Sequence, residues 1–175
     1  MRHHLDYYKT PGFAVKVLLD NLSIYKGSTI FEPCNGNGEI SSLLKQNLDP
    51  ITLITTNDID SNKLADHHFD ASYYNANWPN DIMYVVSNPP FNKAFEILKN
   101  AYECASIGVA FLLRLSFLEP TYNRQNWLIK NPPSSLIVLP RISFTGDGKT
   151  DSVTVAWMIW YKQGNEQKII ITGKN

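Results

Sequence analysis

Short apolar runs alternate with segments of helical periodicity along most of this chain, and this alternation restricts the folds open to it. The runs rich in β-branched and aromatic residues lie at 28–31, 51–56, 82–87, 107–113, 136–139 and 153–161. Helical patterns lie at 11–22, 39–46, 62–66 and 92–105. Strands that alternate with helices are typical of an α/β sandwich with a mainly parallel sheet.

The carboxyl-terminal strands are expected to depart from the parallel arrangement. A glycine-containing loop, with no helical pattern in it, joins 136–139 to 153–161, so these two strands are expected to be antiparallel. The run 169–171 is a candidate edge strand. The chain has 175 residues, enough for one core and cramped for two, so we expect a single domain over 1–175.

Charge and cysteine content exclude several classes of function. The 16 Lys and Arg residues balance 16 Asp and Glu residues, so bulk charge alone does not predict nucleic-acid binding. The 2 cysteines cannot form a disulfide framework, which favours a reducing, cytoplasmic location. The longest apolar runs are too short to cross a bilayer, and no Cys and His spacing matches a zinc site. We therefore expect neither a membrane partner nor a metal.

A glycine turn follows the first expected strand. Gly36 and Gly38 stand between that strand and the next helix, where the missing Cβ atoms let the backbone approach a ligand. A dinucleotide turn would have its third glycine at the position of Ser41, and a carboxylate at Glu32 would repel a diphosphate. Because that carboxylate suits an ammonium group, we expect a ligand with an amino group and no diphosphate.

The second expected strand ends at an acidic residue. Asp58 can accept hydrogen bonds from both hydroxyls of a ribose, and Ile59 would then lie against an adenine ring. Asp70, after an expected third strand, can accept the adenine amino proton. For each acidic residue taken alone, a capping role is the alternative. The turn and Asp58 together predict a ligand with a ribose and an adenine but no diphosphate. S-adenosyl-L-methionine fits this description, since it has a ribose, an adenine, an amino acid tail and a cationic sulfonium.

The run 82–87 ends in Asn88-Pro89-Pro90-Phe91. The prolines stiffen this turn and remove backbone donors, which leaves carbonyl oxygens and the Asn88 amide as hydrogen-bond acceptors. Such acceptors can hold the N–H bonds of a planar amino group and free its lone pair for attack on a methyl carbon. Phe91 can stack on the ring that carries the amine, and in duplex DNA that ring must first be flipped out. A rigid connection from strand to helix is the alternative interpretation.

Together these stretches resemble the class I S-adenosylmethionine-dependent methyltransferases of the N6-adenine type. Residues 32–38 are similar to the family's Asp-Pro-x-x-Gly-x-Gly cofactor loop, with Glu in place of Asp, and 57–60 to its ribose-binding segment. Residues 88–91 resemble its catalytic tetrapeptide, and 8–11 its amino-terminal motif. The resemblance implies a three-layer sandwich around a mainly parallel, seven-stranded, Rossmann-like sheet with an antiparallel carboxyl-terminal strand.

The resemblance also implies roles for individual residues, among them a contact from Thr10 to the cofactor carboxylate. With the reasoning above, the expected cofactor-binding residues are Thr10, Glu32, Pro33, Asn35, Gly36, Gly38, Asp58, Ile59 and Asp70. The expected catalytic residues are Asn88, Pro89, Pro90 and Phe91. Similarity to small bacterial or phage adenine methyltransferases adds Arg141 and Lys149 as phosphate contacts and Phe144 as a wall of the base pocket.

We therefore expect methyl transfer to an exocyclic amine, with adenine N6 in DNA favoured as the acceptor. An adenine in RNA, a glutamine amide in a protein, and an inactive cofactor-binding scaffold subunit are the alternatives. Residues 1–175 leave no segment for a separate target-recognition domain. Recognition would then fall to short loops, to a partner chain, or would be of low specificity.

Overall fold

The computed structural model describes residues 9–74, 77–140, 153–164 and 167–173. Its strands are β1 (Thr29–Glu32), β2 (Leu53–Thr56), β3 (Tyr84–Ser87), β4 (Gly108–Arg114), β5 (Ser135–Val138), β6 (Val155–Tyr161) and β7 (Lys168–Ile171). Its helices are α1 (Gly12–Asn21), α2 (Glu39–Asn47), α3 (Ala94–Cys104), the 3-10 turn η1 (Leu115–Leu118) and α4 (Gln125–Lys130).

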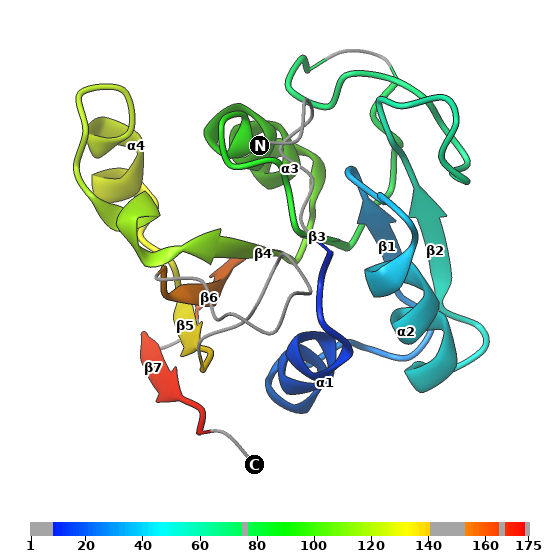
Figure 1. The fold of residues 1–175 in the computed structure, drawn as a ribbon, viewed down its shortest axis with the longest axis horizontal. Coiled ribbons are helices and arrows are strands. Elements are labelled where there is room, and N and C mark those ends of the chain that lie inside the picture. Colours follow the sequence, from blue (N-terminus) through cyan, green and yellow to red (C-terminus); the bar gives the residue numbers. More distant parts are fainter. Residues whose placement is uncertain (1–8, 75–76, 141–152, 165–166, 174–175) are drawn as a thin grey trace.

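All of these strands belong to one seven-stranded sheet of order β2-β1-β3-β4-β6-β5-β7 (Figure 1). The strands β2, β1, β3 and β4 are parallel neighbours, whereas β6 runs antiparallel to both β4 and β5. The expected mainly parallel sheet with an antiparallel strand near the carboxyl terminus is confirmed. The edge strand β7 comes last in the chain and runs parallel to β5.

Helices cover both faces of the sheet, which makes the molecule a three-layer sandwich (Figure 1). On one face, Leu18 of α1 and Leu44 of α2 pack on Ile30, Val86 and other sheet residues. On the other face, α3 and the indole of Trp127 in α4 pack on alternate residues of the same strands. Because the central strands are buried on both sides, they read in the sequence as continuous apolar runs.

The helix expected at 62–66 does not form; the segment is a series of turns. Polar side chains in and beside this segment form other hydrogen bonds. Asp60 Oδ1 accepts hydrogen bonds from the backbone and side chain of Asn62. Asp66 Oδ2 accepts from the backbone and hydroxyl of Thr56, at the end of β2. A single helical turn gains too few bonds to compete with these contacts. The expected third strand is reduced to one isolated bridge between Asn57 and His67.

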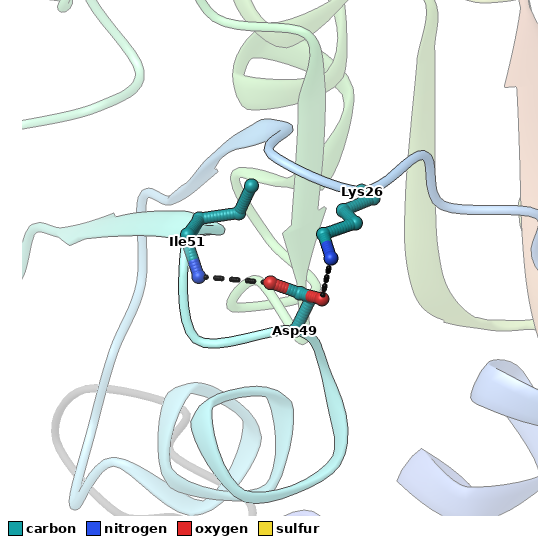
Figure 2. A network of polar contacts seen from close by, with 3 residues as sticks. All are labelled: Lys26, Asp49 and Ile51. Atoms are coloured by element: carbon teal, nitrogen blue, oxygen red, sulfur yellow. Dashed lines mark hydrogen bonds and ion pairs between the residues drawn. The ribbon is translucent and has the colours of Figure 1, made fainter.

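Near the amino-terminal ends of the parallel strands, Asp49 connects the loop before β2 with the loop before β1 (Figure 2). Asp49 accepts a hydrogen bond from the Ile51 backbone at 3.1 Å and forms an ion pair with Lys26 at 2.9 Å. Both partners lie on the surface, so the pair contributes on the order of 0–1 kcal/mol. Within the described residues, no helix has the length and apolar character that a membrane span requires.

Candidate functional site

The motifs singled out in the sequence meet at the carboxyl-terminal ends of the parallel strands. Because β1, β2, β3 and β4 are parallel, their carboxyl ends lie together. These ends deliver the glycine turn, Asp58, the turn at 88–91 and Arg114, respectively. In open α/β sheets, ligands bind in the crevice at this edge.

The glycine turn adopts a backbone conformation that other residues rarely take. Gly36 has φ of 57° and Gly38 has φ of 81°, both in the left-handed region. Asn35, which is buried, holds the turn in place: its side chain donates to the Leu64 carbonyl at 2.7 Å and accepts from the Ser41 hydroxyl at 2.7 Å. Gly38 then caps the amino end of α2, so the turn is a rigid link between β1 and α2.

Asn57 is a structural residue of the site that the sequence reasoning missed. Its buried side chain donates to the carbonyls of Pro33 at 2.9 Å and Phe69 at 3.0 Å, and accepts from the Phe69 N–H at 2.9 Å. Its backbone also bonds to Glu32 and Asn35. One side chain thus ties the glycine turn, the end of β2 and the segment at 69 together. Its place between a strand and Asp58 was the only local signal.

Asp58 lies beside the glycine turn and holds it directly. Its Oδ2 accepts a hydrogen bond from the Gly36 N–H at 2.7 Å, and its Oδ1 accepts from the Asp60 N–H at 2.9 Å. Each carboxylate oxygen has more than one lone pair, so these bonds leave acceptor capacity for a ligand hydroxyl. The carboxylate therefore preorganises the loop and faces the same edge as the glycines.

Glu32 is a buried acid at the end of β1, only 1% exposed. Burial raises its pKa well above the ordinary value; nearby Glu39 and Asp58 add to this, while hydrogen bonds from Ser41 oppose it. Among the described residues, its Oε2 atom has no hydrogen-bond partner. An acid of this kind gains most from a cationic or hydrogen-bond-donating ligand that reaches it.

Two further expected cofactor residues flank this loop. Ile59 is 57% exposed, and Leu64, on the same loop, is 93% exposed, so apolar surface is present beside the glycine turn. Asp70 Oδ1 accepts hydrogen bonds from the backbone and hydroxyl of Ser72, which is the capping geometry named as its alternative role. Its half-buried position near Cys34 keeps it close to the turn.

The Asn-Pro-Pro-Phe turn lies one strand away, after β3. Asn88 Nδ2 donates a hydrogen bond to the hydroxyl of Thr10 at 3.0 Å, across a sequence separation of 78 residues. Thr10 is buried, and Pro89 is buried beneath the turn. The hydrogen bond fixes the orientation of the Asn88 amide and connects the expected catalytic residue to an expected cofactor-binding one.

Phe91 lies against a cation that the sequence reasoning did not assign to it. The Arg114 guanidinium carbon is 4.5 Å from the centroid of the Phe91 ring. A second such pair follows, with Arg124 at 4.9 Å from the centroid of Phe117. The reason for the omission is geometric: Arg114 is 23 residues from Phe91 in the chain, and only the pairing of β3 with β4 brings them together.

The expected substrate contacts Arg141, Phe144 and Lys149 lie outside the described residues. Within the described residues, no group of three or more His, Cys, Asp and Glu side chains has the arrangement of a metal site.

Solved structures match almost the whole chain, whereas no family model and no curated protein matches it. A methyltransferase subunit of a type I restriction–modification system from Streptococcus thermophilus aligns with a TM-score of 0.68 and 15% identity, over 95% of this chain and 49% of that one. A Listeria monocytogenes protein assigned to the class I S-adenosylmethionine-dependent methyltransferases gives 0.66 and 14%, over 92% and 63%. The 23S rRNA methyltransferase ErmE gives 0.59 and 10%, over 92% and 71%.

This chain has the class I methyltransferase fold. At these identities the likeness concerns the fold, and the sheet order and helix layers described above are what the structures share. The chain spans about half the length of the first structures that it matches. Within the methyltransferase fold, the glycine turn and the Asn-Pro-Pro-Phe turn follow the neighbouring strands β1 and β3.

Proposed function

We propose that this chain transfers a methyl group from S-adenosyl-L-methionine to an exocyclic amino group, with adenine N6 in DNA as the favoured acceptor. The observation that carries the proposal is the parallel pairing of β1 with β3, which puts a glycine turn and a proline-stiffened turn side by side. A ligand held at the first would have its reactive end close to an amine held at the second.

The buried carboxyl group of Glu32, at the carboxyl end of β1, fits this cofactor. Glu32 Oε2 is without a hydrogen-bond partner among the described residues and would accept from the amino group of the cofactor's amino acid tail. Gly36 and Gly38 let the backbone approach the ligand closely, and Pro33 and Asn35 hold that loop. The bound cofactor supplies a methyl group on a cationic sulfonium.

The remaining cofactor contacts follow from the same loop. Asp58 accepts hydrogen bonds from the ribose hydroxyls while it keeps the Gly36 N–H in place. Ile59 covers one face of the adenine, which would remove part of its exposed apolar surface from water. Asp70 accepts the adenine amino proton, and Thr10 donates its hydroxyl proton to the cofactor carboxylate while it accepts from Asn88.

The acceptor amine is held by the turn at 88–91. The Asn88 amide oxygen and a backbone carbonyl of this turn accept its two N–H bonds, and Phe91 stacks on its ring. Pro89 and Pro90 add no donors that would compete with the amine. The turn thus acts by positioning and by electrostatics, which are the main requirements of an in-line transfer to a neighbouring carbon.

The identity of the acceptor rests on more general arguments. A stacked aromatic amine suits a nucleobase, and one of the matching structures is a restriction–modification subunit, which favours DNA. Another is an rRNA methyltransferase, so RNA is the next candidate. Two of the matching structures are named as subunits of type I restriction systems, so we propose that a partner chain contributes to target recognition.

The test is mass spectrometry of nucleosides after DNA and RNA pools have been incubated with the protein and the cofactor, with a protein pool labelled in parallel. Asn88→Ala is the matched inactive control. N6-methyl-2′-deoxyadenosine found in DNA that was incubated with the wild type, and absent from DNA incubated with Asn88→Ala, would support the proposal. Methylation found only in RNA or only on protein glutamine would replace the DNA acceptor. Normal cofactor binding without transfer to any pool would indicate the scaffold subunit instead.

A further inference from the structure

We propose that Arg114 binds a backbone phosphate of the nucleic acid whose base is methylated, and that Phe91 holds its guanidinium ready for this contact. The inference rests on the proposed function and adds a substrate-binding residue to it.

Arg114 stands at the edge where the acceptor must enter. It is the last residue of β4 and pairs with Val155 of β6, while β4 also pairs with β3, which leads into the turn at 88–91. Its side chain is half-buried and lies on the ring of Phe91 at 4.5 Å. A base that reaches this turn would therefore bring its own sugar–phosphate backbone near the guanidinium.

The charge of Arg114 is not neutralised in the described part of the molecule. None of the described carboxylates forms an ion pair with it, and within the same residues its guanidinium makes no hydrogen bond. A guanidinium carries five N–H donors, and a ring face satisfies none of them fully. A half-buried cation of this kind gains from an anion that accepts two of its N–H bonds at once, which a phosphate does.

Arg124 shows how a structural arginine differs in the same region. It also stacks on a ring, Phe117, but its Nη2 donates to the carbonyls of Ser116 and Glu119 at 3.3 and 3.4 Å. Those contacts close the loop between η1 and α4. We therefore assign the loop-closing role to Arg124 and the phosphate contact to Arg114.

A phosphate contact has a direct signature in the salt dependence of binding. Each phosphate neutralised changes the slope of log Kd against log salt by about 0.7–0.9. We would measure the anisotropy of labelled DNA and RNA oligonucleotides, single-stranded and duplex, between about 50 and 200 mM salt. For Arg114→Gln we expect binding about tenfold weaker at the lowest salt and a slope smaller by about one contact. The nucleic acid, DNA or RNA, whose affinity falls more in Arg114→Gln is the one that Arg114 contacts.

Two variants control the experiment. Lys162→Gln removes another cation that lies on a ring, at 4.0 Å from the centroid of Tyr102, but its backbone bonds to Ile107 at the amino edge of the sheet. It should leave the slope unchanged. Arg114→Lys keeps the charge and should keep most of the slope. The melting temperature and the cofactor Kd of each variant are measured beside the wild type.

The outcomes separate this inference from the proposed function. An unchanged slope and affinity in Arg114→Gln would overturn the inference, and so would an equal loss in Lys162→Gln or a wild type that binds neither nucleic acid. Should Arg114→Gln fail to fold, Arg114→Met, which keeps a long side chain on the Phe91 ring but removes the charge, is measured in its place, and an unchanged slope in that variant would overturn the inference. Binding that depends on Arg114, without methyl transfer to either pool, would keep the phosphate contact at Arg114 and defeat the proposed function.

Discussion

The two halves of the candidate site are built from different interactions. In the cofactor half, residues 32–41 and 56–70, side-chain amides and carboxylates bond to backbone groups of neighbouring loops. In the proposed acceptor half, residues 88–91 and Arg114, the Arg114 guanidinium lies on the aromatic ring of Phe91. The Thr10–Asn88 hydrogen bond joins the two halves.

This difference teaches what each half must do. The hydrogen-bonded loops of the cofactor half are ordered before a ligand arrives, so less entropy is lost on binding. Contacts between cations and rings are weaker and less directional, so they can be exchanged for contacts to a substrate. The cofactor half thus resembles a preformed binding site, and the acceptor half a surface that changes partners.

The largest expected effect tests the division between the halves. Asn88→Ala should lower kcat by about 10²–10³-fold, the usual cost of losing one group that stabilises the transition state. Because Asn88 is proposed to act on the amine, the cofactor Kd measured by titration calorimetry should stay within about twofold of the wild type. A cofactor affinity that falls as much as the rate would show that the two halves are not separate.

The next effect concerns the stability of the cofactor half. Asn57→Ala should lower the free energy of unfolding by about 2–3 kcal/mol, because buried groups of Pro33 and Phe69 lose their partner. Urea denaturation measures this change. Asn47→Ala is the control, since Asn47 makes one exposed bond to Leu43 and should cost less than about 0.5 kcal/mol. Equal losses in the two variants would remove Asn57 from its proposed role.

Asp58 tests the ligand contact of the same half. Asp58→Ala should weaken cofactor binding by about 1–3 kcal/mol, since both the ligand hydroxyls and the Gly36 N–H lose an acceptor. Asp20→Ala, which removes an exposed carboxylate on α1, serves as the control and should bind the cofactor like the wild type. An unchanged Kd in Asp58→Ala places the ribose elsewhere.

The smallest expected effect is a pH dependence that belongs to Glu32. Its pKa in the folded protein is raised by burial above the ordinary value of 4.5, so the folded state holds a proton that the unfolded state has lost. The stability contribution is therefore full below about pH 4.5 and is lost as the pH rises toward the folded-state pKa. Glu32→Gln should abolish this loss in ligand-free protein.

Melting temperatures of the wild type and Glu32→Gln from pH 5 to pH 8 measure the difference, which should grow with pH in favour of the variant. With the cofactor added, the wild type should have the higher melting temperature, because the ammonium group of the cofactor favours the charged carboxylate of Glu32. The wild type should bind it more tightly as the pH rises, and Glu32→Gln should bind it weakly at every pH. If the melting temperatures of the two ligand-free proteins changed with pH in the same way, the raised pKa of Glu32 would be contradicted.

Local patterns in the sequence determined the seven strands, the helices α1, α2 and α3, the mainly parallel character of the sheet and the positions of the two turns, but not α4 or η1. Each rests on neighbouring residues: continuous apolar runs such as 107–113, glycines at positive φ, and prolines that stop a strand. The single domain over 1–175 and the roles of the site residues stay predictions, since they concern ligands and chain segments beyond the described fold.

Only the tertiary structure decided how the segments meet. It replaced the helix expected at 62–66 with turns, because Asp66 bonds to Thr56 of β2. It placed Asn57 at the centre of three loops and Arg114 on Phe91. These contacts join residues that lie far apart in the chain or depend on strand pairing. Local propensity carries no information about them, because their free energy exists only once the sheet has formed.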